Sequence, residues 1–354
     1  MSYYTYENKI GGPRTYIRTL EESALSSKYD FCSCYQDEAP GGLSIPLLIR
    51  MVKKIKNHNP DIVHVHGAQS EGFYGVITSH LAGCHNIVLT IHGFAHDDSS
   101  CKGIKKLLYK YFIEPITLLL SSKIYTVCNY AAQRNIVKKF GGKRCMGFIH
   151  NPAPNISPKV PRQEMRNMLN IDSNTVALCI VSRITKDKGF HTLGKIIKRL
   201  NEKTLSKFAI LIIGDGDYEL VLRKKLSMEV EKKQVLFIGK TNDVASYLMA
   251  SDIFIFPSLH ENLSIALLEA AQAGLACICS NVGGNSEIIE NNTSGFLIDD
   301  VENVEEYVDK ILQLMNDKTL RHSLGDKAKK SISEKFSISD IISKINAIYD
   351  AVFT

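Results

Sequence analysis

Residues 251–290 read SDIFIFPSLHENLSIALLEAAQAGLACICSNVGGNSEIIE, and this stretch decides the fold. Four apolar residues at 253–256 predict a buried strand that ends at Pro257, because proline cannot donate a hydrogen bond to a sheet. Apolar residues three and four apart then predict a helix over 263–273, which Gly274 ends. A second apolar strand over 275–279 completes a βαβ unit. Such units bind ligands beyond the carboxyl ends of their strands.

Two carboxylates mark this unit, Glu261 in the loop before the helix and Glu269 on it. Eight helical residues would separate them by about 12 Å and leave them roughly 80° apart around the helix axis. Both could then face one elongated ligand. The helix N-terminus between them offers free N–H groups and a positive dipole end, which suit phosphate. A lone helical Glu is more often simply solvated.

The segment resembles the E-x7-E segment of family-four glycosyltransferases, which are retaining enzymes of the two-Rossmann (GT-B) type. Where relatives often have glycines beside the first Glu, this chain has Asn262 and Ser264, which suit a helix start. The resemblance implies that Glu261 contacts sugar hydroxyls and that Glu269 contacts the ribose. It also implies that Asn262, Leu263 and Ser264 face the donor diphosphate. The matching residues are Pro257, Ser258, Glu261, Leu268, Glu269, Ala270, Gly274, Gly283, Gly284 and Glu287.

A second motif, VSRITKDKGF at 181–190, follows another predicted strand. By resemblance, Arg183 and Lys188 hold the donor diphosphate, Arg through a bidentate fork and Lys as a point charge. Taken singly, either cation would more often be a solvated surface residue. Gly214 and Gly216 end the strand at 209–213 and resemble the loop around the nucleotide, although a lone G-x-G is a weak signal.

Strands and helical patterns alternate along the whole chain, which predicts parallel α/β sheets. Proline-rich residues 149–161 indicate a linker. These patterns predict an α/β protein, and the resemblance implies the GT-B type, with two Rossmann-like domains facing across a cleft. The expected domains are an acceptor-side domain over 1–155 and a nucleotide-sugar-binding domain over 156–335. By resemblance, a tail helix over 336–354 returns to the first domain.

The N-terminal stretch departs from the pattern. Gly11 and Gly12, followed by a helical pattern, resemble the family's glycine loop at the donor phosphates. That loop should follow a buried strand, whereas MSYYTYENKI is polar and aromatic. We expect either that the first strand lies outside this sequence or that a longer loop replaces it.

Two histidines, His66 and His92, each end a predicted strand and precede a glycine. A lone His at such a position is more often structural. His92-Gly93-Phe94 nevertheless resembles the family's strand-end His, which lies near the reacting sugar and the acceptor. His92 is therefore a candidate catalytic residue.

The bulk composition limits the function classes. The 354 residues are 44% hydrophobic and 23% charged, as in a globular protein with two domains. Nine scattered cysteines lack zinc-ligand spacing and fit free thiols in a reducing cytoplasm. Residues 1–160 hold 19 Lys+Arg against 11 Asp+Glu, whereas the rest hold 24 against 26.

The basic first half could meet an anionic membrane. Between 101 and 123, lysines alternate with leucines and aromatic residues, which fits a helix at a membrane interface. An ordinary packed amphipathic helix fits the same pattern.

The function that the sequence favours is a retaining, metal-independent hexosyltransferase. It would move a sugar from a nucleotide-diphosphate-sugar to an acceptor hydroxyl, on a lipid-linked or growing glycan in bacterial surface-polysaccharide synthesis. We expect no cofactor, no metal and no nucleic-acid partner, and a cytoplasmic location with peripheral contact at the inner face of the cell membrane. Two alternatives stay open: a non-catalytic partner subunit that binds nucleotide-sugar, and a phosphorylase or epimerase on the GT-B fold.

Overall fold

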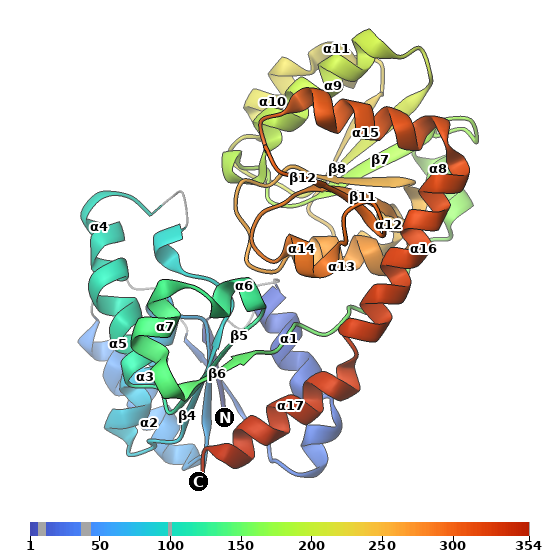
Figure 1. Ribbon diagram of the computed structural model, residues 1–354. Helices are drawn as coiled ribbons and strands as arrows, with labels where there is room; N and C mark the ends of the chain where they lie inside the picture. Colours follow the sequence, from blue (N-terminus) through green and yellow to red (C-terminus); the bar gives the residue numbers. More distant parts are fainter. Residues whose placement is uncertain (6–11, 37–43, 98–100, 354) are drawn as a thin grey trace. The chain divides into compact units, whose positions relative to one another are not determined.

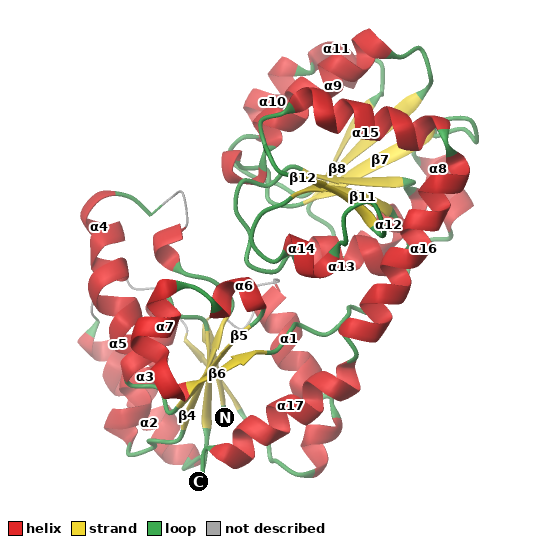
Figure 2. Cartoon of the chain, in the orientation of Figure 1, coloured by secondary structure: helices red, strands yellow, loops and turns green. Residues whose placement is uncertain are grey.

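The computed structural model describes residues 1–5, 12–36, 44–97 and 101–353. The chain forms two compact units. Unit 1 comprises Met1–Pro152 and Ile338–Thr354, and unit 2 comprises Ala153–Ser337. These limits lie within three residues of the domain boundaries expected from the sequence. In both units a single layer of strands lies between two layers of helices (Figure 2).

Unit 1 is built on a six-stranded sheet in the order β2-β1-β3-β4-β5-β6, and every pairing is parallel. The strands are β1 (Ser2–Thr5), β2 (Ser33–Gln36), β3 (Val63–His66), β4 (Ile87–Ile91), β5 (Lys123–Thr126) and β6 (Cys145–Phe148). Its helices are α1 (Gly12–Glu21), α2 (Ile45–His58), α3 (Ser70–Ala82), α4 (Gly103–Leu108), α5 (Glu114–Leu119), α6 (Asn129–Ala132), α7 (Asn135–Gly141) and α17 (Ile338–Ala351). Shorter turns are η1 (Ala24–Ser27), η2 (Ala95–Asp97), η4 (Gly142–Arg144) and the π-helical η3 (Tyr109–Ile113).

The expectation that the first strand is absent from this sequence is wrong. Residues Ser2–Thr5 form β1, which lies between β2 and β3 and pairs with both. A central strand of a parallel sheet normally reads as an apolar run. Here tyrosines, which have high β-propensity, stand where Val and Ile are usual. A search for an apolar run therefore missed the strand.

The C-terminal helix α17 packs on unit 1, beside α1 (Figure 1). Ile341, Ile345 and Ile348 recur at intervals of four and three, so they lie on one face of the helix. That face joins Tyr16 and Leu20 of α1 in a buried cluster. A second cluster, on the other side of the sheet, joins β3 and β4 to α2 and α3.

Unit 2 holds a second parallel sheet in the order β12-β11-β10-β7-β8-β9. The strands are β7 (Val176–Val181), β8 (Phe208–Ile213), β9 (Val235–Gly239), β10 (Ile253–Phe256), β11 (Ala276–Ser280) and β12 (Gly295–Ile298). The helices are α8 (Arg162–Met168), η5 (Lys186–Lys188), α9 (Phe190–Lys203), α10 (Glu219–Lys225), α11 (Ser227–Glu231), α12 (Val244–Ala250), α13 (Ile265–Gln272), α14 (Asn285–Ile288), α15 (Val304–Asn316) and α16 (Lys318–Lys335).

The strand order locates a ligand site in each unit. In unit 2 the chain proceeds outward from β7 through β8 to β9, then returns to β10 on the other side of β7. The connections leaving β7 and β10 therefore diverge, which opens a crevice at the carboxyl ends of these two strands. In unit 1 the same reversal falls between β1 and β3. None of the helices formed by the described residues is both long and apolar enough to cross a membrane.

Candidate active site

The loops after β7 and β10 are held together at backbone level. The amide of Leu259 donates to the carbonyl of Asp187 at 2.8 Å. Gly189 has φ +74°, and a Cβ there would lie 1.7 Å from the carbonyl oxygen of Pro257. Only glycine lets the two loops approach this closely. The segment that carries Arg183 and Lys188 is thereby fixed against the segment that carries Glu261.

Two further glycines hold neighbouring loops in place. A Cβ on Gly214 would lie 1.9 Å from the carbonyl oxygen of Ser182, and one on Gly283 would lie 1.9 Å from that of Glu261. The amide of Gly284 donates to the carbonyl of Asn262 at 2.7 Å. The loops that follow β7, β8, β10 and β11 therefore converge at the carboxyl edge of the sheet. Gly214 acts here by close packing against the loop that carries Arg183.

Lys188 and Glu261 form an ion pair across the two loops. The Nζ of Lys188 lies 2.7 Å from Oε1 of Glu261, and both side chains are mostly buried. Arg183 lies on the same loop as Lys188 but is exposed. Its guanidinium makes no ion pair or hydrogen bond with the described residues, so its five donors remain available to an anion.

Helix α13 begins at Ile265, two residues later than predicted. The hydroxyl oxygen of Ser264 accepts a hydrogen bond from the amide of Leu267 at 3.2 Å, which makes Ser264 the N-cap. Glu261 consequently lies in the loop, four residues before the helix. The spacing of Glu261 and Glu269 that we derived from one continuous helix is therefore wrong, because helical periodicity does not extend to Glu261.

Glu269 lies in the middle of α13, between the buried Leu268 and Ala270. Burial raises the pKa of the Glu269 carboxyl to about 7, because desolvation disfavours its charged form. The group therefore changes charge near neutral pH. A carboxyl with such a pKa is typical of functional sites, and it accepts hydrogen bonds from ligand hydroxyls more strongly once ionised.

In unit 1, His66 ends β3, His92 follows the adjacent strand β4, and the two side chains lie close together. Their ring centroids are 5.9 Å apart, and the edge of Tyr16 contacts both rings. Both nitrogens of His66 and Nε2 of His92 are buried without a hydrogen-bond partner among the described residues. Burial lowers the pKa of His92 to about 4 and holds that of His66 well below its usual value. Both rings are therefore neutral at pH 7.

The two predicted loop glycines of unit 1 have different outcomes. Gly12 is the first residue of α1, while Gly11 lies outside the described residues. The helix after the glycine loop is thus present, although the loop itself is not described.

A buried hydrogen-bond network under His66 was missed in the sequence. Nδ1 of His64 lies 2.7 Å from the hydroxyl of Tyr349, and Nε2 lies 2.6 Å from that of Thr90. The hydroxyl of Tyr125 lies 3.2 Å from the same Nε2 and 2.8 Å from the hydroxyl of Tyr16. The strand period of two does place His64 and His66 on one face of β3. The tyrosines that meet them come from distant parts of the chain, so local spacing could not reveal the network.

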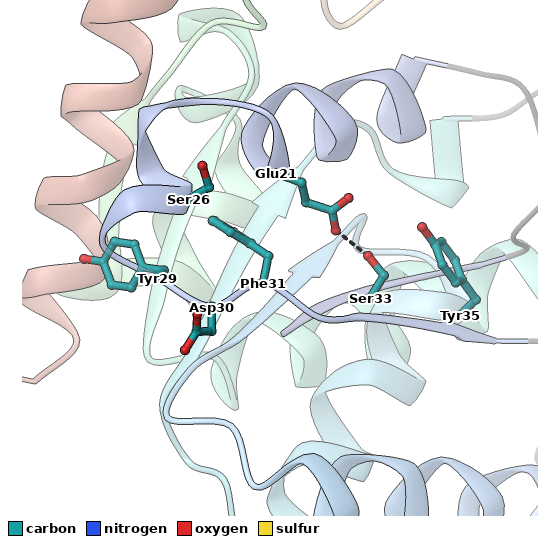
Figure 3. Close-up of a pocket in the computed structure, with 7 residues that line it drawn as sticks. All are labelled: Glu21, Ser26, Tyr29, Asp30, Phe31, Ser33 and Tyr35. Atoms are coloured by element: carbon teal, nitrogen blue, oxygen red, sulfur yellow. Dashed lines mark hydrogen bonds between the residues drawn. The ribbon is translucent and has the colours of Figure 1, made fainter.

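A separate hollow of about 570 Å³ lies on unit 1 beside the edge strand β2 (Figure 3). Glu21 at the end of α1 points toward Ser33 of β2, which donates a hydrogen bond to it. None of the predicted site residues lines this hollow. It therefore lies apart from both carboxyl-edge sites.

Comparisons with known proteins match both units. The family described as "Glycosyl transferases group 1" matches residues 161–331, and "Glycosyl transferase 4-like" matches residues 21–123. The first of these segments contains every predicted site residue of unit 2. The second contains His66 and His92.

Two curated relatives are similar over most of the chain. One is a "UDP-Gal:alpha-D-GlcNAc-diphosphoundecaprenol alpha-1,3-galactosyltransferase" of Escherichia coli, 28% identical over 85% of this chain and 78% of the relative. Another is the "Capsular polysaccharide biosynthesis glycosyltransferase CapM" of Staphylococcus aureus, 24% identical over 86% of this chain and 80% of the relative.

Among solved structures, HepE of Anabaena in complex with UDP and glucose superimposes with a TM-score of 0.79. It is 18% identical, and the match covers 99% of both chains. At this identity the likeness concerns the fold.

Proposed function

Because this chain is a glycosyltransferase of the group 1 family with the GT-B fold, we propose that it transfers a sugar from a UDP-sugar with retention of anomeric configuration. The observation that carries the proposal is the convergence of Arg183, Lys188 and the N-terminus of α13 at the β7/β10 edge of unit 2. Two cations and a helix N-terminus complement a diphosphate. We propose uridine as the nucleoside of the donor because UDP appears in the names of a curated relative and of a solved structure that this chain resembles.

Leaving-group stabilisation is the main task of this site. Negative charge develops on the diphosphate as the bond between the anomeric carbon of the sugar and the diphosphate oxygen breaks. Fixed positive groups accelerate that step. Before the donor arrives, Lys188 pairs with Glu261. When the Lys188 ammonium pairs with the diphosphate instead, the Glu261 carboxylate becomes available to accept hydrogen bonds from the sugar hydroxyls. Glu269, farther along α13, accepts hydrogen bonds from the ribose.

The acceptor side belongs to unit 1, where His92 is neutral. A neutral imidazole both donates and accepts a hydrogen bond, which suits a sugar hydroxyl better than a diphosphate. The buried, partnerless Nε2 of His92 is consistent with a hydroxyl partner. The names of the relatives favour a lipid-diphosphate-linked or capsular glycan as acceptor.

We test this function by screening UDP-, GDP-, ADP- and dTDP-sugars for thermal stabilisation of the protein. The best donor is then incubated with a GlcNAc-diphospho-lipid, and the product is identified by mass. A UDP-sugar should stabilise most, and proton NMR of the product should show the anomeric configuration of the donor. An inverted product would contradict the retaining mechanism, and the absence of both binding and transfer across the panel would contradict the function.

The same arrangement supports a metal-independent reaction, because Arg183, Lys188 and the helix end would supply the positive charge that a divalent ion provides in other enzymes. Activity should therefore survive EDTA. Loss of activity in EDTA that Mg²⁺ or Mn²⁺ restores would show that a metal takes part.

Peripheral attachment to an anionic membrane is supported by α4 and η3. A packed amphipathic helix would bury its apolar face, yet Ile104 is 85% exposed and Phe112 is 60% exposed. Leu107, Leu108 and Tyr111 are exposed too. In Figure 1, α4 extends beyond the sheet while α5 lies nearer to it, and Glu114 and Leu118 of α5 are buried. The exposed apolar stripe is thus fixed to the body of unit 1.

Lysines accompany this stripe at 102, 105, 106 and 110, and all four are exposed. Each contributes about 1 kcal/mol near an anionic lipid surface, screened beyond a Debye length of about 8 Å. Together with the inserted apolar side chains, they would hold the enzyme at the leaflet that carries a lipid-linked acceptor.

Liposome co-sedimentation tests the attachment. We expect binding to vesicles that contain acidic lipid at low salt and much less binding at high salt. Ile104→Ser combined with Phe112→Ser should reduce binding at least tenfold, while Leu205→Ser, at an exposed apolar position of unit 2, should not. Equal recovery in the supernatant under all conditions would show that α4 and η3 do not attach the protein to lipid.

A further inference from the structure

A cavity of about 640 Å³ lies in unit 2 at the amino ends of its strands. Its wall includes Thr175, Asp252 and Leu275, which precede β7, β10 and β11. The candidate donor site lies at the carboxyl ends of the same strands. The cavity is therefore at the opposite edge of the sheet, where residues of α8 and α16 line it (Figure 1 labels both helices).

The charge of this cavity differs from that of its surroundings. Residues 161–354 hold 24 Lys+Arg and 26 Asp+Glu, a net charge of −2. The cavity wall nevertheless carries a net charge of +3. Its charged residues are Arg162, Arg166, Lys318, Arg321 and Lys329 against Asp252 and Asp326, with His322 beside them.

Two of the arginines are engaged within the wall. Arg162 and Arg166 both contact Asp252, at 2.7 and 3.2 Å. Arg166 also donates to the backbone carbonyls of Asp172 and Thr175. These contacts fix the loops around the cavity, and neither arginine needs a ligand.

Arg321 is different, because its side chain is buried yet only one of its donors is bonded within the described part of the protein. It is 9% exposed, and its guanidinium donates one hydrogen bond, from Nη1 to the carbonyl of Leu314 at 2.5 Å. Its other N–H donors have no acceptor among the described residues, and the side chain lines the cavity. A buried guanidinium with free donors is costly unless an anion or water satisfies it.

The lysines lie on the same face of α16 as Arg321. Eleven residues separate Lys318 from Lys329, which is three helical turns to within about 20°. Neither ammonium group forms an ion pair or hydrogen bond with the described residues, and the Lys329 side chain passes beside Gly274. A Cβ on Gly325 would lie 2.1 Å from the carbonyl oxygen of Gly274, so α16 is seated at a fixed distance from this wall.

We propose that this cavity binds a phosphate-bearing small molecule, held by the guanidinium of Arg321 and the ammonium groups of Lys318 and Lys329. Arginine offers a planar fork that matches phosphate oxygens, and lysine adds point charges. The volume exceeds what a phosphate alone needs, and Ser173 and Asn174 supply polar groups for the rest of the molecule. The site is independent of the transfer reaction.

The test uses the full chain with its donor site disabled by Arg183→Ala and Lys188→Ala, so that phosphates do not bind there. Inorganic phosphate, pyrophosphate and glucose 1-phosphate are titrated by calorimetry at low salt. We expect saturable binding with one site per chain. Adding Lys318→Ala and Lys329→Ala should weaken this binding at least tenfold. The matched control adds Lys327→Ala and Lys330→Ala, which remove the same charge from exposed positions of α16, and should change binding less than twofold.

The outcomes separate the sources of the phosphate. Tightest binding of inorganic phosphate identifies the free ion, and tightest binding of glucose 1-phosphate identifies a phosphorylated sugar. Absence of saturable binding in the donor-disabled protein would overturn the proposal. Equal losses in the Lys318/Lys329 variant and the control would overturn it too, because they would show only a general effect of charge. Neither result depends on whether the protein transfers sugar.

Discussion

The carboxyl edges of the two sheets carry opposite kinds of chemistry. At the edge of unit 2 lie an exposed arginine, a lysine–glutamate ion pair and a helix N-terminus. At the edge of unit 1, His66 is buried and His92 half-buried; both rings are neutral and border Tyr16. Both units have parallel Rossmann-like sheets, so the fold does not set this difference. The residues that follow each strand set it.

The difference matches the two substrates of a glycosyl transfer. A departing diphosphate needs positive charge, and unit 2 provides it. An acceptor hydroxyl is neutral, and a charged histidine beside it would lack the lone pair to accept its proton. Burial keeps the histidines of unit 1 in the form that has this lone pair.

The largest effect should come from removing the charge of unit 2. Arg183→Ala and Lys188→Ala should each lower kcat by about 100-fold or more, through lost leaving-group stabilisation. Steady-state kinetics with a UDP-sugar measures this. Lys186→Ala, in the same short turn but exposed, is the matched control and should stay within about threefold. Near-normal turnover in both site variants, with folding intact, would remove these residues from the donor site.

A second test concerns the contact between the β7 and β10 loops. Gly189→Ala should lower the free energy of unfolding by about 3 kcal/mol or more, because its Cβ would overlap the Pro257 carbonyl. Gly239 has a similar φ of +78° but open space around its Cβ position. Gly239→Ala should therefore cost only about 1 kcal/mol, the strain of the left-handed backbone. Equal losses in chemical denaturation would mean that the loops are not in close contact.

The neutral histidines predict acid sensitivity. Their pKa values are lowered in the folded state, so below the ordinary value of 6.5 the unfolded chain binds protons that the folded chain does not. The free energy of unfolding is therefore not reduced by these histidines above pH 6.5, and it falls as the pH drops toward 4. The thermal midpoint should therefore fall between pH 7 and pH 5, and His66→Phe should reduce that fall. A wild-type midpoint that stays constant over this range would contradict the burial of neutral rings.

The smallest expected effect concerns Glu269. Its raised pKa keeps it protonated in the folded state between pH 4.5 and about 7, so the stability that it contributes is lost as the pH rises through 7. In the proposed site, the ionised form would accept hydrogen bonds from the ribose more strongly. We expect the Kd for UDP to fall about threefold from pH 6 to pH 8, by an amount typical of one charge-assisted hydrogen bond. Glu269→Gln should remove that dependence, and an unchanged slope in this variant would assign the titration to another group.

Local patterns foresaw much of unit 2. The apolar run at 253–256, the proline and the helical spacing placed β10 and α13 correctly, with an error of two residues at the start of the helix. That error arose because Leu263 has the right apolar spacing but precedes the capping Ser264. Periodicity locates a helix face, whereas the cap geometry fixes its end.

Features built from distant residues were not visible in the sequence. The network from Tyr16 to Tyr349 spans the length of the chain, and the cavity beside α16 collects residues from five separate segments. The sequence also could not predict that the apolar side chains of α4 are exposed. The same amphipathic pattern occurs in helices that pack on a protein core and in helices that bind a lipid surface. Short-range spacing cannot separate these cases.

The central claim is that the cations of unit 2 hold the diphosphate and that His92 of unit 1 does not. Calorimetric titration of UDP into the wild-type protein, Lys188→Ala and His92→Ala tests it most directly, because UDP carries no sugar and needs no acceptor. The account predicts that Lys188→Ala raises the Kd at least tenfold, while His92→Ala leaves it within about twofold of the wild-type value. Unchanged binding in Lys188→Ala, or a large loss in His92→Ala, would contradict it.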